Sequence, residues 1–344
     1  MAGSSDVRIS LLGLGRAGSF HLASIRALPG VELLQVHDTD RARAERVAAE
    51  YGCGVAADAK EATVAPEVDA VVVATPTQTH FEYVAAALEA GKPVLSEKPL
   101  GTDVAQIDRC FARAGEQGVP LLVAFQRRFD PSFAAVAKAA HEGRVGPLQF
   151  IRSVSRDNPV PSLDYLRSSC GIFHDCVVHD LDLVCYVAGE APEEVFAFGS
   201  NLVPEIREIG DLDNVIVTLR FPSGLLASID VSRQGTHGYD QRIEVLGTGG
   251  MVQAENRAQT TAVLSTREGS TRPPIDHSFP TRYLDAYRAE FACFLECVRG
   301  EREVPITHAD VRLSHRLADA AERSARGGRL VRLSEEGEAA DGAG

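Results

Sequence analysis

The sequence predicts an α/β protein in which a doubly wound domain precedes an α+β domain with a large, open, mostly antiparallel sheet. Two observations carry this prediction. Strand-sized apolar runs alternate with helical segments up to residue 124, and strands without helices between them dominate after residue 190. Alternation is typical of a parallel sheet with helices on both faces, and consecutive strands are typical of an antiparallel sheet. With 344 residues, the chain is long enough for two hydrophobic cores.

We expect the first domain over residues 1–124. Its predicted strands are Val7–Leu12, Val31–His37, Ala70–Ala74, Val94–Ser96 and Leu121–Ala124. The helices predicted between them are Ser19–Leu28, Arg41–Tyr51, Thr79–Gly91 and Val104–Gly118. The carboxyl ends of parallel strands form the ligand crevice of such a sheet, so functional residues of this domain are expected there.

We expect the second domain over residues 125–334, followed by a disordered acidic tail over 335–344. Helices are predicted at Ser132–Gly143, Asp175–Ala188, Arg282–Arg299 and Thr307–Arg326. An antiparallel meander is predicted from strand-period alternation and glycine turns, after a first strand at Pro147–Arg156. Its strands are Glu194–Ser200, Asn214–Phe221, Leu225–Ser232, Gln241–Leu246, Met251–Glu255 and Ala262–Thr266.

The overall composition narrows the classes of partner. The formal net charge of −13 argues against nucleic acid or an anionic membrane as the main partner, because both require a basic surface. No apolar run is long enough to cross a bilayer, and the first residues lack the pattern of a signal peptide. The seven cysteines show no CxxC spacing. We therefore predict a reducing, cytoplasmic setting, while the net charge says little about a small neutral substrate.

The segment Gly13–Gly18 reads G-x-G-x-x-G directly after the first strand and before a helix. Gly13 permits the tight turn, Gly15 allows the backbone to approach a pyrophosphate, and Gly18 allows the helix to pack on the strand. The backbone of Arg16 and Ala17 opens the helix, whose N-terminus favours phosphate. The pattern in this setting predicts a Rossmann-type dinucleotide site.

Asp38 ends the second predicted strand, about 20 residues after the glycine turn, where an acidic side chain binds the adenosine ribose. A carboxylate there would repel a 2′-phosphate, so NAD is predicted rather than NADP. Arg41 and Arg43 weaken that preference and Asp40 offsets them. The alternative for Asp38 is a plain helix cap.

Two further strand ends are predicted to line the cofactor crevice. They contribute Thr75, Pro76, Thr77 and His80 after the third long strand, and Glu97 and Lys98 after the next. Lys98 would be an ordinary solvated lysine if it stood alone. Its place at a strand end, before Pro99, favours a functional role.

Asp175, His179 and Asp182 lie at i, i+4 and i+7 of a predicted helix that is otherwise mostly apolar. The alternative is a helix start with Asp175 as the cap and His179 as a core histidine. That alternative does not explain three ionisable residues in one stripe, because buried charge is costly unless it is paired or used. A histidine oriented by a carboxylate can act as a general base near neutral pH.

The glycine turn, Glu97-Lys98-Pro99 and Asp175-x-x-x-His179 together resemble the Gfo/Idh/MocA oxidoreductase family. More narrowly, the sequence resembles its inositol dehydrogenase branch. The stretches that carry this second likeness are Arg127–Asp130, Ser155–Asp157, Val178–Asp182 and Gly238–Val245. The resemblance covers about residues 7–333.

The resemblance implies an NAD-dependent dehydrogenase that oxidises a ring hydroxyl of a polyol, with myo-inositol and its 2-keto product as the leading pair. It implies that His179 accepts the hydroxyl proton and that Lys98 hydrogen-bonds the reacting oxygen. Asp175 would orient these two residues or relay a proton for them. The remaining hydroxyls would be bound by Arg127, Asp157, Asp182, Tyr239 and, less strongly implied, His237. Cys170 stands where the family often has glycine, and Cys176 follows Asp175; neither is expected to touch the catalytic residues.

Other functions stay open at this point: a dehydrogenase of scyllo-inositol or an aldose, a glycosidase that uses bound NAD, or a nucleotide-binding sensor without catalysis. No metal is expected, because the cysteines and histidines lack ligand spacing. The predicted open sheet has a face that needs cover, which favours a homo-oligomer, either a dimer or a tetramer.

Overall fold

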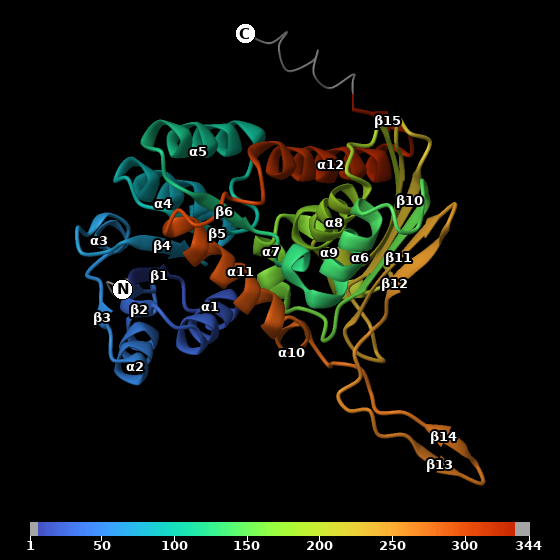
Figure 1. Cartoon of the computed structure of the whole chain (residues 1–344), viewed down its shortest axis with the longest axis horizontal. Helices are drawn as coiled ribbons and strands as arrows, with labels where there is room; N and C mark the ends of the chain where they lie inside the picture. Colours follow the sequence, from blue (N-terminus) through green and yellow to red (C-terminus); the bar gives the residue numbers. More distant parts are fainter. Residues whose placement is uncertain (1–5, 334–344) are drawn as a thin grey trace. The chain divides into compact units, whose positions relative to one another are not determined.

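The computed structural model describes residues 6–333, which form two compact units (Figure 1). One unit comprises the chain up to Phe129 together with Leu284–Arg312, and the other comprises Asp130–Tyr283 together with the chain from Leu313 onward. The sequence-based boundary at 124/125 kept the whole later chain in the second domain. The return of Leu284–Arg312 to the first unit has a packing reason: Tyr287 stacks on Phe20 with ring centroids 4.7 Å apart. The predicted acidic tail, 335–344, lies outside the described residues.

The first unit contains a six-stranded parallel sheet in the order β3-β2-β1-β4-β5-β6, which confirms the doubly wound prediction. Its strands are β1 (Val7–Leu12), β2 (Val31–His37), β3 (Gly54–Val55), β4 (Ala70–Val73), β5 (Val94–Glu97) and β6 (Leu121–Ala124). Its helices are α1 (Arg16–Ala27), α2 (Arg41–Tyr51), α3 (Ala59–Val64), α4 (Thr77–Glu89), α5 (Val104–Gln117) and α11 (Leu284–Val298), with a 3₁₀ turn η1 (Gln126–Phe129). Strands β4, β5 and β6 are buried along their whole length, as expected of a sheet covered on both faces.

The second unit contains a seven-stranded sheet in the order β12-β11-β7-β10-β9-β8-β15. Its strands are β7 (Leu148–Arg156), β8 (Glu194–Ser200), β9 (Asn214–Arg220), β10 (Leu226–Ser232), β11 (Asp240–Gly247), β12 (Gly250–Ala254) and β15 (Val331–Arg332). Its helices are α6 (Pro131–His141), α7 (Leu163–Ser168), η2 (Phe173–Val177, a π-helix), α8 (Val178–Ala188), α9 (Pro204–Glu208), α10 (Phe279–Arg282) and most of α12 (His308–Gly327). A separate hairpin pairs β13 (Leu264–Thr266) with β14 (Gly269–Thr271).

The predicted meander is correct in part. Strands β8, β9 and β10 pair antiparallel in sequence order, and β11 and β12 form a hairpin. However, β7 inserts between β10 and β11 and runs parallel to β10, so the sheet is mixed. The strand predicted at Ala262–Thr266 is not part of this sheet, because its residues form the small β13–β14 hairpin instead.

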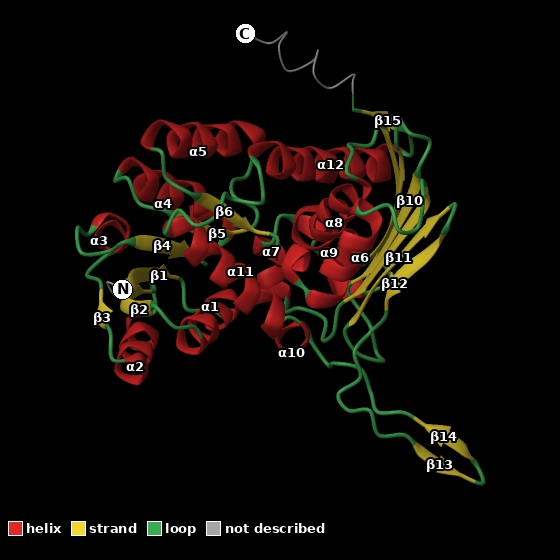
Figure 2. Ribbon diagram, in the orientation of Figure 1, coloured by secondary structure: helices red, strands yellow, loops and turns green. Residues whose placement is uncertain are grey.

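Helices cover one face of the seven-stranded sheet, as Figure 2 shows for α6, α8 and α9. α6 packs against β11 and β12, and α8 packs against β7 and β10. Asp180 of α8 is fully buried and accepts hydrogen bonds from the hydroxyl groups of Ser153 and Ser155 on β7, at 2.6 and 2.7 Å. This buried carboxylate fixes α8, which carries His179, to the sheet. Among residues 6–333, no helix is both long and apolar enough to cross a membrane.

Candidate active site

The glycine turn after β1 has the geometry that a pyrophosphate site requires. Gly13 has a φ of +88°, and a Cβ there would lie 2.4 Å from the carbonyl oxygen of Ala74. A Cβ on Gly18 would lie 2.0 Å from the carbonyl oxygen of Gly13, so the helix can pack this closely only on a glycine. At Gly15 a Cβ would meet no atom within 4 Å. The turn is therefore tight against the protein at its two ends and open at Gly15, the N-cap of α1.

Asp38 fastens this turn to the end of β2. One carboxylate oxygen accepts a hydrogen bond from the backbone N–H of Leu14 at 2.8 Å, and the other accepts from the N–H of Asp40 at 2.8 Å. The plain-cap alternative fails, because Asp40 is the N-cap of α2 and accepts from the N–H of Arg43. The guanidinium of Arg43 lies 3.4 Å from both carboxylates, so its charge is paired with Asp38 and Asp40.

The loops after β4 and β5 are joined by His80. One ring nitrogen lies 2.7 Å from the carbonyl oxygen of Thr75, and the other lies 2.7 Å from the carbonyl oxygen of Pro99. The Thr75 hydroxyl accepts a hydrogen bond from Thr79, and Pro76 is the N-cap of α4, which starts at Thr77. His80 is only 2% exposed, so it shapes the predicted crevice from behind and does not present its ring to a ligand.

Glu97 and Lys98 have different surroundings although they are neighbours. Glu97 is buried at the end of β5, and its carboxylate lies 3.0 Å from Nε2 of His21 on α1. It therefore links two elements of the cofactor domain rather than facing solvent. Lys98 is half-buried in the loop that follows. The pair places one carboxylate in the core and one amine at the strand end, where ligands of such sheets bind.

Asp175 is not a helix cap. The helix predicted from Asp175 begins as the π-helix Phe173–Val177 and becomes α8 only at Val178, so Asp175 lies inside a wide turn. One carboxylate oxygen accepts a hydrogen bond from the hydroxyl of Tyr165 at 2.7 Å, and the other accepts from Arg233 at 2.9 Å. The Asp175 carboxylate is thus held in a defined orientation. His179 follows on α8, half-buried between buried neighbours.

Arg233 is a functional candidate that no sequence motif indicated. It directly follows β10, is 0% exposed, and bridges Asp175 and Asp211 with bonds of 2.9 and 3.0 Å. Burial opposes the charge of Arg233, but Cys176, Asp175 and Asp211 outweigh it and raise the pKa of the guanidinium. The only signal in the sequence was an arginine directly after an apolar strand, which is common on protein surfaces.

Cys176 contacts the predicted site, contrary to expectation. Its Sγ lies 3.4 Å from a carboxylate oxygen of Asp157 and 3.8 Å from one of Asp175, and Arg233 donates to it at 3.5 Å. The π-helix explains the error, because its wider turn changes which side chains share a face. Cys170 is the only non-glycine residue with positive φ, at 63°, within residues 6–333. Glycine would adopt that conformation without strain.

The other predicted polyol-binding residues have varied surroundings. Arg127 is buried in η1, and Asp182 is 1% exposed and accepts a hydrogen bond from Ser314 at 3.3 Å. Tyr239 is buried, with its ring edge against Tyr283. His237 is exposed and lies 3.1 Å from Asp240. Asp182 is therefore the candidate that solvent reaches least.

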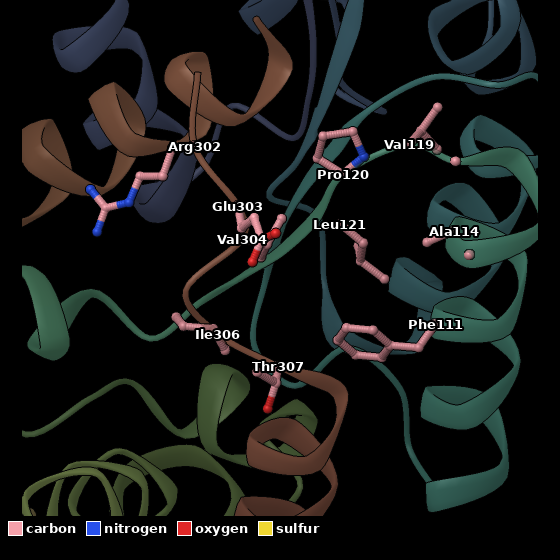
Figure 3. Close-up of a pocket in the computed structure, with 12 residues that line it drawn as sticks. Phe111, Ala114, Val119, Pro120, Leu121, Arg302, Glu303, Val304, Ile306 and Thr307 are labelled. Atoms are coloured by element: carbon pink, nitrogen blue, oxygen red, sulfur yellow. The ribbon is translucent and has the colours of Figure 1, made fainter. Parts of the chain in front are cut away.

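One surface pocket of the first unit lies away from these residues. Figure 3 shows it between α5 and the segment that leads from α11 to α12, lined by residues such as Phe111, Leu121 and Ile306. None of the predicted catalytic, cofactor-binding or polyol-binding residues lines it. It is therefore not a candidate for the active site.

Comparisons with known proteins match both parts of the chain. Residues 7–125 match the oxidoreductase family with an NAD-binding Rossmann fold, and residues 133–253 match the GFO/IDH/MocA C-terminal domain. The inositol 2-dehydrogenase of Rhizobium meliloti is 40% identical over 320 residues, which cover 92% of this chain and 96% of that protein. The myo-inositol 2-dehydrogenase of Thermotoga maritima is 38% identical, covering 96% of this chain and 99% of that protein.

A solved structure extends the comparison to a complex. The scyllo-inositol dehydrogenase of Lactobacillus casei, with bound cofactor NAD(H) and scyllo-inositol, is 26% identical. It superposes with a TM-score of 0.90 and covers 96% of this chain and 100% of that chain. The fold, the NAD-binding domain and the likeness to inositol dehydrogenases thus agree with the resemblance noted in the sequence.

Proposed function

Because the chain belongs to the GFO/IDH/MocA family of oxidoreductases, we propose that it is an NAD-dependent polyol dehydrogenase that oxidises myo-inositol to its 2-keto product. The observation that carries the proposal is the full-length likeness to two inositol 2-dehydrogenases, on a chain whose glycine turn and Asp38 fit a dinucleotide. NAD, when bound, supplies the nicotinamide that accepts a hydride.

In the proposed reaction, His179 accepts the proton of the hydroxyl group while hydride leaves the same carbon. The carbon–hydrogen electron pair leaves with the hydride, and the oxygen becomes the carbonyl oxygen of the ketone. Lys98 donates a hydrogen bond to that oxygen and stabilises the negative charge that develops on it. Lys98 belongs to the first unit and His179 to the second.

Asp175 would orient the proton-accepting group, and its surroundings support that role. Tyr165 and Arg233 each donate to one of its carboxylate oxygens, so the carboxylate has little freedom to rotate. Asp157 and Tyr239 would recognise the other ring hydroxyls. A polyol site rejects poor substrates when its polar groups are left unpaired, so several such contacts give specificity.

The second candidate substrate is scyllo-inositol, and one observation favours it. The Lactobacillus casei structure with a TM-score of 0.90 is a scyllo-inositol dehydrogenase in complex with that polyol. The two inositols differ only in the orientation of one hydroxyl group. The same residues would serve both reactions, so only turnover can rank them.

The direct test is NADH formation by the purified chain with myo-inositol, scyllo-inositol, glucose or xylose, each with NAD and with NADP. The proposal expects the highest kcat/KM for myo-inositol with NAD, and loss of turnover in Lys98→Ala and His179→Ala with NAD binding retained. A preference for another polyol would contradict the substrate. If the chain binds NAD but oxidises none of these four compounds, the proposed dehydrogenase activity is contradicted.

We further propose that the open face of the seven-stranded sheet pairs with a second copy of the chain. A row of exposed apolar side chains crosses four neighbouring strands at one register: Leu226, Phe150, Leu246 and Met251, each directly opposite the next. Exposed apolar patches of this kind mark interaction sites. Light scattering after gel filtration should give a dimer or a tetramer. Leu246→Glu with Met251→Glu should reduce the mass, while Leu264→Glu in the β13–β14 hairpin should not; an unchanged mass in the double variant would refute this interface.

A further inference from the structure

Two histidines and an aspartate meet in the second unit, outside the residues assigned to catalysis. Nε2 of His174 lies 3.0 Å from one carboxylate oxygen of Asp319, and Nε2 of His315 lies 3.8 Å from the other. One ligand atom from each of the three residues lies within 4.8 Å of the others. His174 is 145 positions from Asp319, so the spacing of residues in the sequence could not reveal the cluster.

The cluster differs from an ordinary surface ion pair in its burial and geometry. His174 and His315 are only 9% and 5% exposed, and their ring centroids are 4.7 Å apart. Nε2 of His315 lies 3.8 Å from its carboxylate oxygen, a longer separation than a hydrogen bond.

We propose that His174, His315 and Asp319 form a site for a divalent transition-metal ion of the zinc class. Imidazole nitrogen and carboxylate oxygen bind Zn²⁺ at about 2.0–2.2 Å, which places tetrahedral ligands roughly 3.3–3.6 Å apart. The two histidine nitrogens lie 3.0 and 3.8 Å from different oxygens of Asp319, and one ligand atom from each residue lies within 4.8 Å of the others. Binding of one ion would therefore draw the three side chains closer together.

The chain positions these ligands on two elements. His315 and Asp319 are at i and i+4 on α12, one turn apart on one helix face, a spacing that lets two side chains bind one ion. His174 comes from the π-helix Phe173–Val177. Three protein ligands leave a fourth position for water. The positive charge of Arg323 also acts on Asp319, so we expect weaker binding than at a closed four-ligand zinc site.

The site is independent of the proposed dehydrogenation, which requires no metal. A bound ion would replace the hydrogen bond between His174 and Asp319 and tie the π-helix to α12. Because an ion that binds the folded chain and not the unfolded chain stabilises the fold, zinc should raise the melting temperature.

The test is titration of the untagged, metal-stripped chain with Co²⁺, followed by displacement with Zn²⁺. We expect one Co²⁺ per chain, with visible d–d bands and without a thiolate-to-cobalt band, because the site holds no sulfur. His315→Gln and Asp319→Asn should each weaken binding by at least about 100-fold, since even outer-shell partners of a metal site contribute about 10–100-fold. His277→Gln, an exposed histidine outside the cluster, is the matched control and should bind normally.

Circular dichroism would show that each variant is folded, and zinc should raise the melting temperature of the unsubstituted chain but not of His315→Gln. Binding that survives both substitutions would overturn the proposal. So would the absence of bound Co²⁺, a thiolate band that assigns the ion to a cysteine, or equal loss of binding in the His277→Gln control.

Discussion

Glu290 offers the sharpest prediction about the first unit. It lies on α11 with 0% exposure, and neither of its carboxylate oxygens has a hydrogen-bond partner among the described residues. Burial, together with the nearby charge of Glu97, raises the pKa of Glu290 well above its usual 4.5. The side chain is therefore a neutral acid over a pH range in which an unfolded chain would carry the charge.

This difference makes the stability of the protein depend on pH. Above pH 4.5 the folded chain retains a proton that the unfolded chain has lost, so stability decreases as pH rises toward the raised pKa. The loss is about 1.4 kcal/mol for each pH unit in that window. Glu290→Gln removes the titrating group but keeps its shape, so it should remove this contribution to the pH slope.

The assay is urea unfolding at two pH values about two units apart, both above 4.5. Relative to the unsubstituted chain, Glu290→Gln should gain stability at the higher pH, by at most about 1.4 kcal/mol for each pH unit between the two conditions. Glu296→Gln is the matched control, because Glu296 is on the same helix but is 44% exposed and paired with Arg302. Equal pH slopes for Glu290→Gln and the unsubstituted chain would refute a neutral, buried Glu290.

Three further predictions concern Arg233 in the candidate site, the glycine turn at Gly13, and the buried carboxylate of Asp240. Arg233→Met leaves two nearly buried carboxylates without their cation, so it should destabilise the chain by about 3–5 kcal/mol and lower kcat, with partial recovery in Arg233→Lys; an unchanged unfolding midpoint would contradict this. Gly13→Ala places a Cβ 2.4 Å from a carbonyl oxygen at positive φ, which should cost at least about 1–2 kcal/mol of stability. It should weaken NAD binding at least about ten-fold in a calorimetric titration, and an unchanged NAD affinity would contradict a role of this turn in binding NAD. Burial opposes ionisation of Asp240, but hydrogen bonds from Arg242, Asn256 and His237 lower its pKa to about 2. The stability that its charge contributes is therefore complete above pH 3.8 and is lost as the pH falls through 2. Asp240→Asn should therefore cost at most about 2 kcal/mol at neutral pH and almost nothing near pH 2 in urea unfolding, and a cost that persists in acid would contradict the charge argument.

The cofactor domain was predictable because its signals are local. The longer strands are mainly apolar, and the turn before α1 needs glycine at Gly13 for a positive φ and at Gly18 for close packing. β3 and α3 escaped prediction because they are short, with two and six residues. Such elements are stabilised by their neighbours and not by their own periodicity.

The second unit was harder to predict because its organisation depends on distant contacts. No pattern within Leu148–Arg156 states that β7 pairs with β10 on one side and β11 on the other. The π-helix at Phe173–Val177 was likewise not visible in the sequence, and it overturned two expectations: an α-helix that begins at Asp175, and the separation of Cys176 from the site. Arg233 became visible as a partner of Asp175 only when the fold brought residues 58 positions apart together.

Isotope labelling of the substrate would follow the hydride from the polyol to the nicotinamide. The chain would be incubated with NAD and myo-inositol that carries deuterium at carbon 2, and the NADH would be analysed by mass spectrometry and NMR. Transfer of hydride from that carbon predicts NADH with deuterium at carbon 4 of the nicotinamide, in equal amount to the 2-keto product, and no label with His179→Ala. Unlabelled NADH, or no NADH from a chain that binds NAD, would contradict the proposed oxidation of myo-inositol at carbon 2.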